Sequence, residues 1–262
     1  MSTRTERDQM LHKHQWLWSV LLVSLSLRAQ QVTTGAPAVH RTPKTAYYID
    51  PTILDTGLVL PAPSGADSPE SKDELAELHR IEQSRTPEQV SRAKADDAEE
   101  DIFAFKGVFG PGFNAESLPI TAALGEHIKN EQSVVGGQLK REFQRPRPYQ
   151  SDTTLHPVCP MKEAHDSYPS GHAMTGYLEA FTLIEIAPEM RTAILQRADE
   201  FARSRMICGV HYSSDIEASR KVAYLVFGYI LATPRFQKDL ALSRQEMRDK
   251  LNLVGNKSVS SK

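Results

Sequence analysis

The chain has 262 residues, of which 40% are apolar and 24% charged, and its formal net charge is −2. This composition is that of an ordinary globular protein with enough apolar residues for one good-sized core, so we expect a single domain. The balanced charge argues against nucleic acid as the main partner, because nucleic-acid-binding proteins present a strongly basic face.

The N-terminus has the pattern of an export signal. A mildly basic start precedes an apolar run from Trp16 to Leu27. The run is shorter than the roughly 20 residues of a membrane-spanning helix but fits the core of a signal peptide. We predict a signal peptide over residues 1–38, with cleavage after Ala29 or Ala38, and no stable membrane insertion of the mature protein. The alternative is an uncleaved anchor or a buried helix.

Residues 39–71 are rich in Pro, Ala, Gly, Thr and Ser and show little hydrophobic periodicity. Such a segment predicts an extended N-terminal arm that wraps the domain or joins a neighbouring subunit. Helical patterning begins at Lys72, so residues 72–262 form the predicted domain.

Apolar residues at helical spacing divide this domain into helices. A capping box at Thr86 to Gln89 begins one of them, and the segment from Phe109 to Phe113 is a predicted turn. Strand signals are almost absent and no internal repeat is visible, which predicts an all-α, single-domain helical bundle. The predicted helices start at Lys72 and Pro87 and then cover Ile120 to Phe143, Ser170 to Ala187, Pro188 to about Ile207, the segment after Asp215 to Leu231, and Pro234 to about Leu253. A polar loop, Tyr149 to Tyr168, precedes the helix that starts at Ser170, and Gly136-Gly137 is a weak point in the helix from Ile120 to Phe143.

Three short segments carry residues with catalytic potential: K-x6-R-P from Lys140, P-S-G-H from Pro169, and S-R-x5-H-x3-D from Ser204. Any one of them is weak evidence, and a basic cluster such as Lys140 to Arg147 alone would indicate a solvated helix end. Together they supply the cations, imidazoles and carboxylate that attack on a phosphate ester by a protein nucleophile requires. The cations are Lys140, Arg147 and Arg205, the imidazoles are His172 and His211, and the carboxylate is Asp215.

Ser170 and Gly171 stand at the predicted start of an apolar helix, behind a proline. Free backbone N–H groups and the helix dipole favour an anion at such a position, and glycine allows close approach of the backbone. His172 follows in the first turn. This segment therefore predicts a phosphate-binding helix end.

His211 and Asp215 are four residues apart, which places both on one side of a helix. The carboxylate can then accept the Nδ1 proton and leave Nε2 as a nucleophile. We expect His211 to form a phosphohistidine and His172 to act as general acid and then base. The cations are expected to neutralise the phosphate, so no metal and no cofactor is required, and the need for opposite protonation states of the two histidines predicts a mildly acidic optimum.

Other interpretations of single residues are weaker. Ser170 lacks the glycine two residues earlier that a serine hydrolase would show, because Tyr168 stands there. Cys159 and Cys208 form a disulfide or remain two free buried thiols, and the predicted signal peptide favours the bridge. A metal site would have to draw on loop residues without a recognised ligand spacing: His156, Cys159, His165 and Asp166.

With its three motifs in this order, the chain resembles the class A bacterial non-specific acid phosphatases of the type 2 phosphatidic acid phosphatase and vanadium haloperoxidase-like superfamily. Similarity extends to Phe109–Thr121 and Ser204–Gly209. The resemblance implies an all-α fold, export to the periplasm, metal-free hydrolysis of phosphate monoesters, and assembly as a homodimer or larger homo-oligomer. It implies that residues 72–262 are the catalytic domain, with His211 as nucleophile and His172 as acid. Some relatives also transfer phosphate to alcohols.

The expected partners are small phosphate monoesters such as nucleotides, sugar phosphates and aryl phosphates, with vanadate or inorganic phosphate as inhibitors. Two positions depart from the family pattern G-S-Y-P-S-G-H-T: Asp166 adds a negative charge near the anion site, and Ala173 removes a hydroxyl beside the general acid. The alternatives are a vanadate-dependent haloperoxidase, whose chains are usually longer, and a periplasmic phosphoester-binding protein, which would not need the His211–Asp215 pair.

Overall fold

A computed structural model describes residues 45–253 of the chain. The predicted signal peptide, residues 1–38, lies outside the described residues. Within the described range the chain forms α-helices and short 3-10 turns and no strand, so the prediction of an all-α fold is confirmed. None of the helices in this range is both long enough and apolar enough to cross a membrane.

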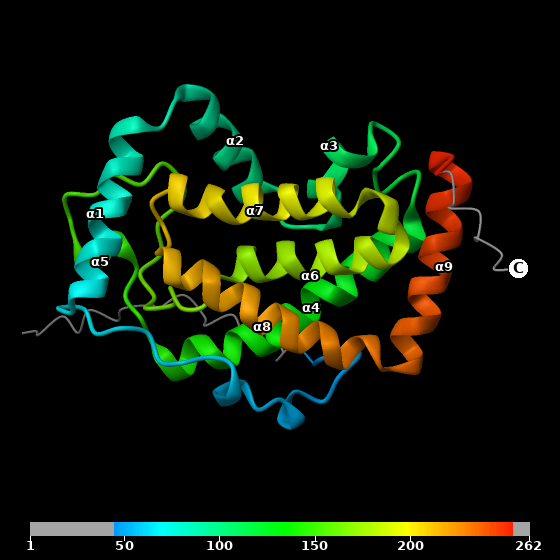
Figure 1. The fold of residues 1–262 in the computed structure, drawn as a ribbon, viewed down its shortest axis with the longest axis horizontal. Coiled ribbons are helices and arrows are strands. Elements are labelled where there is room, and N and C mark those ends of the chain that lie inside the picture. Colours follow the sequence, from blue (N-terminus) through cyan, green and yellow to red (C-terminus); the bar gives the residue numbers. More distant parts are fainter. Residues whose placement is uncertain (1–44, 254–262) are drawn as a thin grey trace, which may run out of the picture. The chain divides into compact units, whose positions relative to one another are not determined.

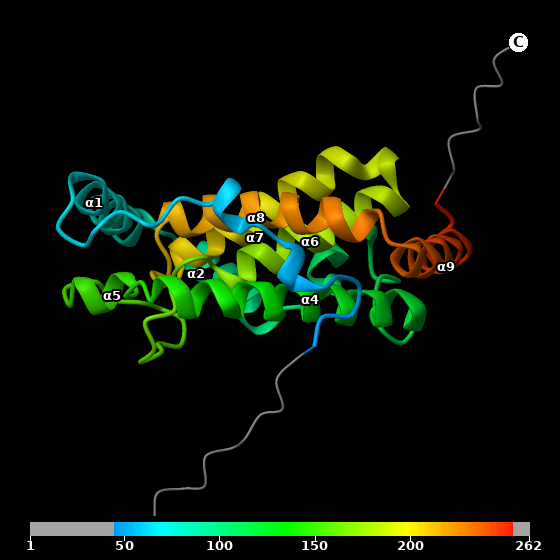
Figure 2. The ribbon, with the colours of Figure 1, turned by 90° about the horizontal axis from the view of Figure 1, so that it is seen from below.

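Helix α6, Gly171–Ile186, lies at the centre of the bundle (Figure 1). Its sequence is apolar on almost every side, as a helix enclosed by protein requires, and most of its residues are buried. Helices α7, Arg191–Ile207, and α8, Ser213–Leu231, pack along it, and α4, Pro119–Phe143, packs against it in a second layer (Figure 2). Helix α9, Pro234–Leu251, contacts α4 and α6.

Two N-terminal helices, α1 at Pro69–Ser84 and α2 at Pro87–Ala98, contact α7. The predicted capping box is present at the start of α2, where the backbone N–H of residue 89 donates to Thr86 Oγ1 over 3.3 Å. A buried ion pair of 2.6 Å joins Asp96 of α2 to Arg197 of α7. This pair holds the C-terminal end of α2 against α7, close to the site described below.

The described part of the N-terminal arm lies on the same chain's helices. It contains two 3-10 turns, Pro51–Ile53 and Thr56–Leu58. The backbone N–H of Tyr48 donates to the buried Glu131 of α4 over 2.6 Å, and the Tyr48 hydroxyl donates to Asp239 of α9 over 2.9 Å. These bonds fasten the arm across α4 and α9.

The structure differs from the predicted elements in five places. The predicted weak point in α4 does not interrupt the helix, which runs through Gly136 and Gly137. A Cβ on Gly136 would come within 2.8 Å of the side chain of Gln132, one turn earlier in the same helix, so glycine leaves room for that side chain. The predicted polar loop opens with a short helix. A 3-10 turn replaces the first residues of the predicted 188–207 helix. The short helix in the loop is α5, Pro148–Ser151, and the 3-10 turn is η4, Pro188–Met190. Two further elements were not predicted: η3, Ile102–Phe105, and α3, Lys106–Phe109.

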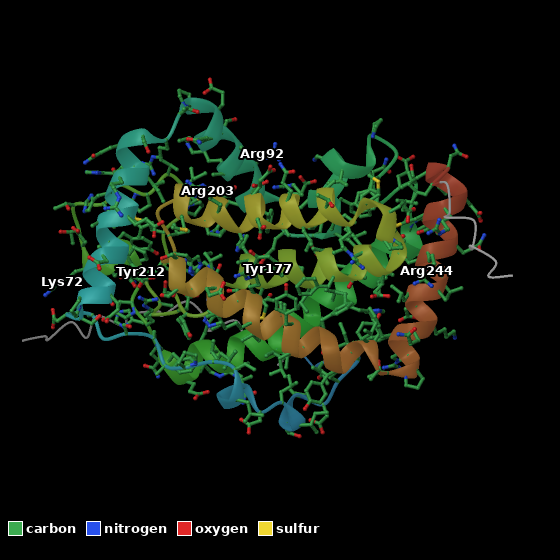
Figure 3. The ribbon with its side chains drawn as sticks, in the orientation of Figure 1. Lys72, Arg92, Tyr177, Arg203, Tyr212 and Arg244 are labelled. Carbon is green, nitrogen blue, oxygen red and sulfur yellow. A yellow bond between two sulfur atoms is a disulfide. The ribbon has the colours of Figure 1, made fainter. Side chains whose placement is uncertain are left out.

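The directions of the four long helices decide where the predicted motifs meet. Helices α4 and α7 end, and α6 and α8 begin, at the same end of the bundle, on the left in Figure 1. Tyr212, which immediately precedes α8, marks this end in Figure 3. All three motifs lie at these helix ends, so the fold gathers residues from distant parts of the sequence into one place.

Candidate active site

The first turn of α6 forms the floor of the site. Ser170 is the N-cap, and its hydroxyl accepts the backbone N–H of residue 173 over 3.4 Å. Gly171 is the first helical residue, and a Cβ there would lie 3.2 Å from Gln132 of α4. The remaining N–H groups of this turn and the positive end of the helix dipole favour an anion.

Arg147 reaches the site from an extended residue just before α5. Its Nη1 donates to the carbonyl oxygen of Val210 over 3.0 Å, and its Nε donates to Asp166 over 2.7 Å. The side chain is almost fully buried. A guanidinium held in this way presents a fixed set of donors, which suits recognition of a phosphate.

Two further cations come from the ends of α4 and α7. Lys140 donates its Nζ proton to the carbonyl oxygen of Asp166, and burial lowers the pKa of this lysine to about 8. Arg205 donates from Nη1 to Asp97 over 2.6 Å. The buried Nε of Arg205 has no hydrogen-bond partner among residues 45–253. An unpaired buried donor is costly unless an acceptor can reach it, so this side chain is suited to bind an anion.

His211 is buried, and the structure orients both of its ring nitrogens. Nδ1 lies 3.1 Å from Oδ2 of Asp215, and Nε2 lies 3.2 Å from Nη1 of Arg147. Because the ionised carboxylate accepts a proton from Nδ1, the lone pair of Nε2 faces the Arg147 guanidinium. The potential nucleophile therefore points at a group that would bind a phosphate oxygen.

Asp215 is fully buried in the first turn of α8, where it collects several donors. Besides His211, Oδ2 accepts the Ser167 hydroxyl over 2.6 Å and the backbone N–H of Tyr212 over 2.9 Å. Oδ1 accepts Nη1 of Arg145 over 2.7 Å. This set of bonds satisfies the buried carboxylate and fixes the imidazole that it orients.

Sequence reasoning assigned no role to Arg145, which the structure buries beneath the site. Its Nη2 donates to Glu74 of α1 over 2.8 Å, and its guanidinium lies 3.9 Å from the centre of the Tyr212 ring. Arg145 stands in the predicted basic cluster, but nothing in its spacing distinguished it from the exposed Arg141. Only its contacts with residues far along the chain reveal its position.

His172 lies in the first turn of α6 beside acidic residues at the end of α2 and just after it. Its Nε2 is 3.3 Å from the carbonyl oxygen of Asp97, and its Nδ1 is 3.5 Å from the carboxylate of Glu100. Burial, followed by the charge of Arg205, lowers the pKa of His172 to about 3. In the free protein this imidazole is therefore neutral at mildly acidic pH, and it becomes an acid only when an anion is added to its surroundings.

The protonation of His211 is disfavoured in the same way. Burial is the main cause of its lowered pKa, followed by the charges of Arg147, Lys140 and Arg205 and of a protonated His172. The guanidinium groups of Arg147 and Arg205 therefore act on both imidazoles. Such an environment favours a bound anion.

The remaining predicted residues are placed as follows. Cys159 and Cys208 are joined by a disulfide, which ties the loop between α5 and α6 to the end of α7. No three His, Cys, Asp or Glu side chains gather as a metal-binding group within the described range, and His156 pairs with Glu82 over 2.9 Å. Ala173, which departs from the family pattern, is buried in α6.

The family model described as the PAP2 superfamily matches residues 123–239 of the chain, which contain all three motifs. The non-specific acid phosphatase of Salmonella typhimurium is 32% identical over 214 residues, covering 77% of this chain and 83% of that protein. The non-specific acid phosphatase of Providencia stuartii is 33% identical over 149 residues, covering 55% of this chain and 59% of that protein. Among solved structures, a transmembrane PAP2 type phosphatidylglycerolphosphate phosphatase from Bacillus subtilis aligns with a TM-score of 0.44 at 16% identity, covering 63% of this chain and 86% of that chain.

Replacing Arg145 should destabilise the protein strongly. In Arg145→Gln the carboxylates of Asp215 and Glu74 lose their buried cation, and removal of one partner of a buried ion pair typically costs about 3–5 kcal/mol. Urea unfolding of the wild type and the variant measures this difference. Arg141→Gln is the matched control, because this neighbouring arginine is exposed, and its effect should stay within about 0.5 kcal/mol. Equal stability of the two variants would contradict the assigned role.

The two buried histidines predict that acidification destabilises the free protein. An unfolded histidine titrates near pH 6.5, whereas the folded pKa of His172 is about 3 and that of His211 is also lowered. Below about pH 6.5 the unfolded chain therefore binds more protons than the folded chain. The free energy of unfolding should fall by up to ~1.4 kcal/mol per pH unit for each histidine, which urea unfolding between about pH 6.5 and 5 can measure.

A control variant and a ligand separate these two histidines from other titrating groups. His172→Gln should show a shallower decrease of the unfolding free energy over the same pH range. Inorganic phosphate should also reduce the decrease in the wild type, because a bound anion raises both histidine pKa values. A decrease that is the same with and without His172 would mean that other groups cause it.

Proposed function

The chain belongs to the PAP2 superfamily and is an acid phosphatase, a phosphoric monoester hydrolase, and we propose that it acts through a phosphohistidine formed on His211. The main support for this proposal is the orientation of the His211 imidazole. Asp215 holds Nδ1 at 3.1 Å, so that the lone pair of Nε2 faces the guanidinium of Arg147 at 3.2 Å. A phosphate bound by that guanidinium would lie next to the nucleophile.

The phosphate group of the substrate would bind at the start of α6. In the free protein Arg147 and Arg205 are each paired with a carboxylate, that of Asp166 or that of Asp97. A phosphate would take over these donors, together with the N–H groups of Gly171 and His172 and the Nζ of Lys140. The cations would then stabilise the charge on the equatorial oxygens in the transition state, so the mechanism needs no metal ion.

In the first step, Nε2 of His211 attacks phosphorus and the bond to the ester oxygen breaks. The leaving alcohol takes a proton from His172, whose pKa rises when the phosphate anion is bound. The monoanion of a phosphate monoester, which predominates below about pH 6, can deliver this proton on binding. This source of the proton, and the low pKa of His172 in the free protein, support a mildly acidic optimum.

In the second step, His172 accepts a proton from water, the water oxygen attacks phosphorus, and the bond to His211 breaks to release inorganic phosphate. An alcohol in place of water would give phosphate transfer, which we include in the proposal. Small phosphate monoesters are the proposed substrates, and vanadate and inorganic phosphate the proposed inhibitors, because each offers a tetrahedral group of oxygens to the same cations.

We also propose export to the periplasm and assembly into a homo-oligomer. Two observations support export: the signal-like pattern of residues 1–38 and the disulfide between Cys159 and Cys208, since disulfides persist mainly in oxidising compartments. Oligomerisation is proposed only because the motifs resemble those of the class A acid phosphatases.

The mechanism predicts that the activity depends on His211 and not on added metal. With p-nitrophenyl phosphate between about pH 5 and 7 and EDTA present, the wild type should turn over, and His211→Ala should lose activity on the order of 10⁴-fold or more. His156→Ala is the matched control, because that exposed histidine lies outside the site, and it should retain full activity. Mass spectrometry after rapid quenching should find the phosphoryl group on His211.

Other results would direct attention to the alternatives. Activity that survives loss of His211, or that requires a divalent metal, would contradict the mechanism. Phosphate binding without turnover would favour a binding protein. Halide oxidation on addition of vanadate and peroxide would favour a haloperoxidase.

A further inference from the structure

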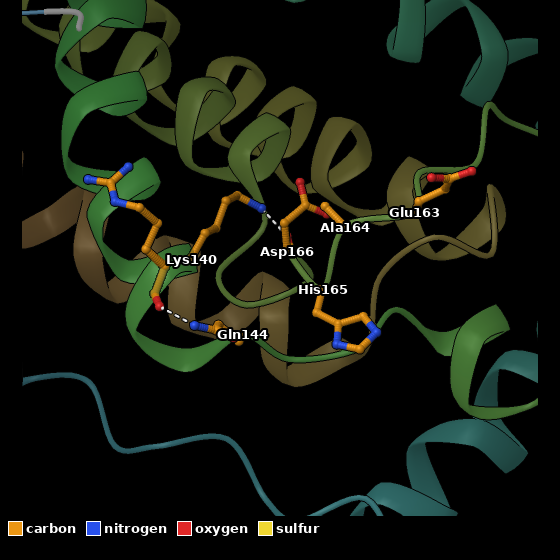
Figure 4. A pocket seen from close by; sticks show the side chains of 7 residues that line it. Lys140, Gln144, Glu163, Ala164, His165 and Asp166 are labelled. Atoms are coloured by element: carbon orange, nitrogen blue, oxygen red, sulfur yellow. Dashed lines mark hydrogen bonds between the residues drawn. The ribbon is translucent and has the colours of Figure 1, made fainter. Parts of the chain in front are cut away.

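Asp166, in the loop that precedes α6, accepts hydrogen bonds from two of the three proposed phosphate-binding cations, Arg147 and Lys140. Its carboxylate accepts Nε of Arg147 over 2.7 Å, and its carbonyl oxygen accepts the Nζ of Lys140, the contact drawn as a dashed line in Figure 4. One residue therefore occupies donors that a substrate phosphate would need.

Asp166 is a charged competitor at this position. Burial opposes its ionisation, but the hydrogen bond from Arg147 and the charges of Lys140 and Arg147 together hold the pKa of the carboxyl below its usual range. It therefore stays ionised over the mildly acidic range in which the enzyme is proposed to work. A phosphate bound at Arg147 would either displace this carboxylate or lie next to its negative charge, and both cost binding free energy.

The carboxylate has space to move. A hollow of about 440 Å³ opens beside Lys140 and is lined by Asp166 itself (Figure 4). The exposed Arg141 also lines this hollow, so a displaced carboxylate would find a second cation there. The side chain of Asp166 is about a quarter exposed, at 23%, unlike that of Arg147, at 4%. Movement of the carboxylate away from a fixed guanidinium is therefore the less costly change.

We propose that Asp166 sets the affinity of the site for phosphate by acting as a built-in competitor at Arg147. It weakens the binding of inorganic phosphate, the product, so that product leaves readily, and it weakens the binding of substrate phosphate by the same contact. The glycine usual at this position of the family pattern carries no such charge, so the effect belongs to this chain. The inference rests on the proposed roles of Lys140 and Arg147.

The test is direct binding of inorganic phosphate, measured by isothermal titration calorimetry at mildly acidic pH and constant ionic strength. Asp166→Asn keeps the shape of the side chain and removes its charge, and Asp166→Gly removes the side chain. Both should lower the Kd for phosphate at least about fivefold, as expected when a partly buried charge-assisted contact no longer competes. Glu163→Gln is the matched control, because it removes a charge from an exposed residue of the same loop that lines the same hollow, and its Kd should not change.

Kinetics supply a second readout. The KM for p-nitrophenyl phosphate should fall in both Asp166 variants, and their progress curves should bend earlier as phosphate accumulates. A role limited to positioning Arg147 predicts the opposite, weaker phosphate binding and a higher KM. An unchanged Kd in either folded Asp166 variant would also overturn the inference.

Arg147→Gln separates this inference from the proposed function. If this substitution weakens phosphate binding while the Asp166 variants bind phosphate no more tightly than the wild type, the competitor role is wrong and the phosphate site stands. If Arg147→Gln leaves the Kd unchanged, the proposed phosphate site is wrong. In the Arg147→Gln background, Asp166→Asn should no longer tighten binding, because the contact through which it competes is gone.

Discussion

The buried carboxylate of Asp215 is the group on which the arrangement of the site depends. A charge without access to water is tolerated only when it is paired and hydrogen-bonded, and its partners come from three separate segments. Arg145 follows α4, Ser167 precedes α6, and His211 precedes α8. Satisfying this carboxylate brings the three segments together. The same bonds leave Nε2 of His211 directed at the guanidinium of Arg147.

The burial of several ionisable groups is the second property of the site. Three cations and two imidazoles lie within a largely buried volume, which lowers the pKa of Lys140, His172 and His211. In the free protein the carboxylates of Asp97 and Asp166 pair with Arg205 and Arg147. A phosphate anion could meet several of these donors at once. In the proposed mechanism, the binding of substrate and the protonation of His172 are thus linked.

Helix directions explain why such a site can be built from helix ends. Helix α6 contributes its N-terminal N–H groups, while α4 and α7 contribute cations from their last turns. Side chains on helices that are packed along their whole length move little, so the site rests on a rigid support. The loop with Asp166 lies between these helix ends and is held by the disulfide to Cys208. The proposed competition by Asp166 therefore involves a loop residue and leaves the supporting helices unchanged.

The sequence by itself determined the all-α class and most helix boundaries, because these follow from local spacing, and it named the candidate site residues that the structure places at one end of the bundle. Helical periodicity and caps act over a few residues, and His211 and Asp215 meet because they are four apart. The tertiary structure alone revealed that Arg145 supports Asp215, 70 residues away, and that Asp97 pairs with Arg205, 108 residues away. It also revealed that the carboxylate of Asp166 lies on Arg147. Contacts between distant residues leave no pattern in a single sequence, since they depend on how the helices pack and in which direction each one runs.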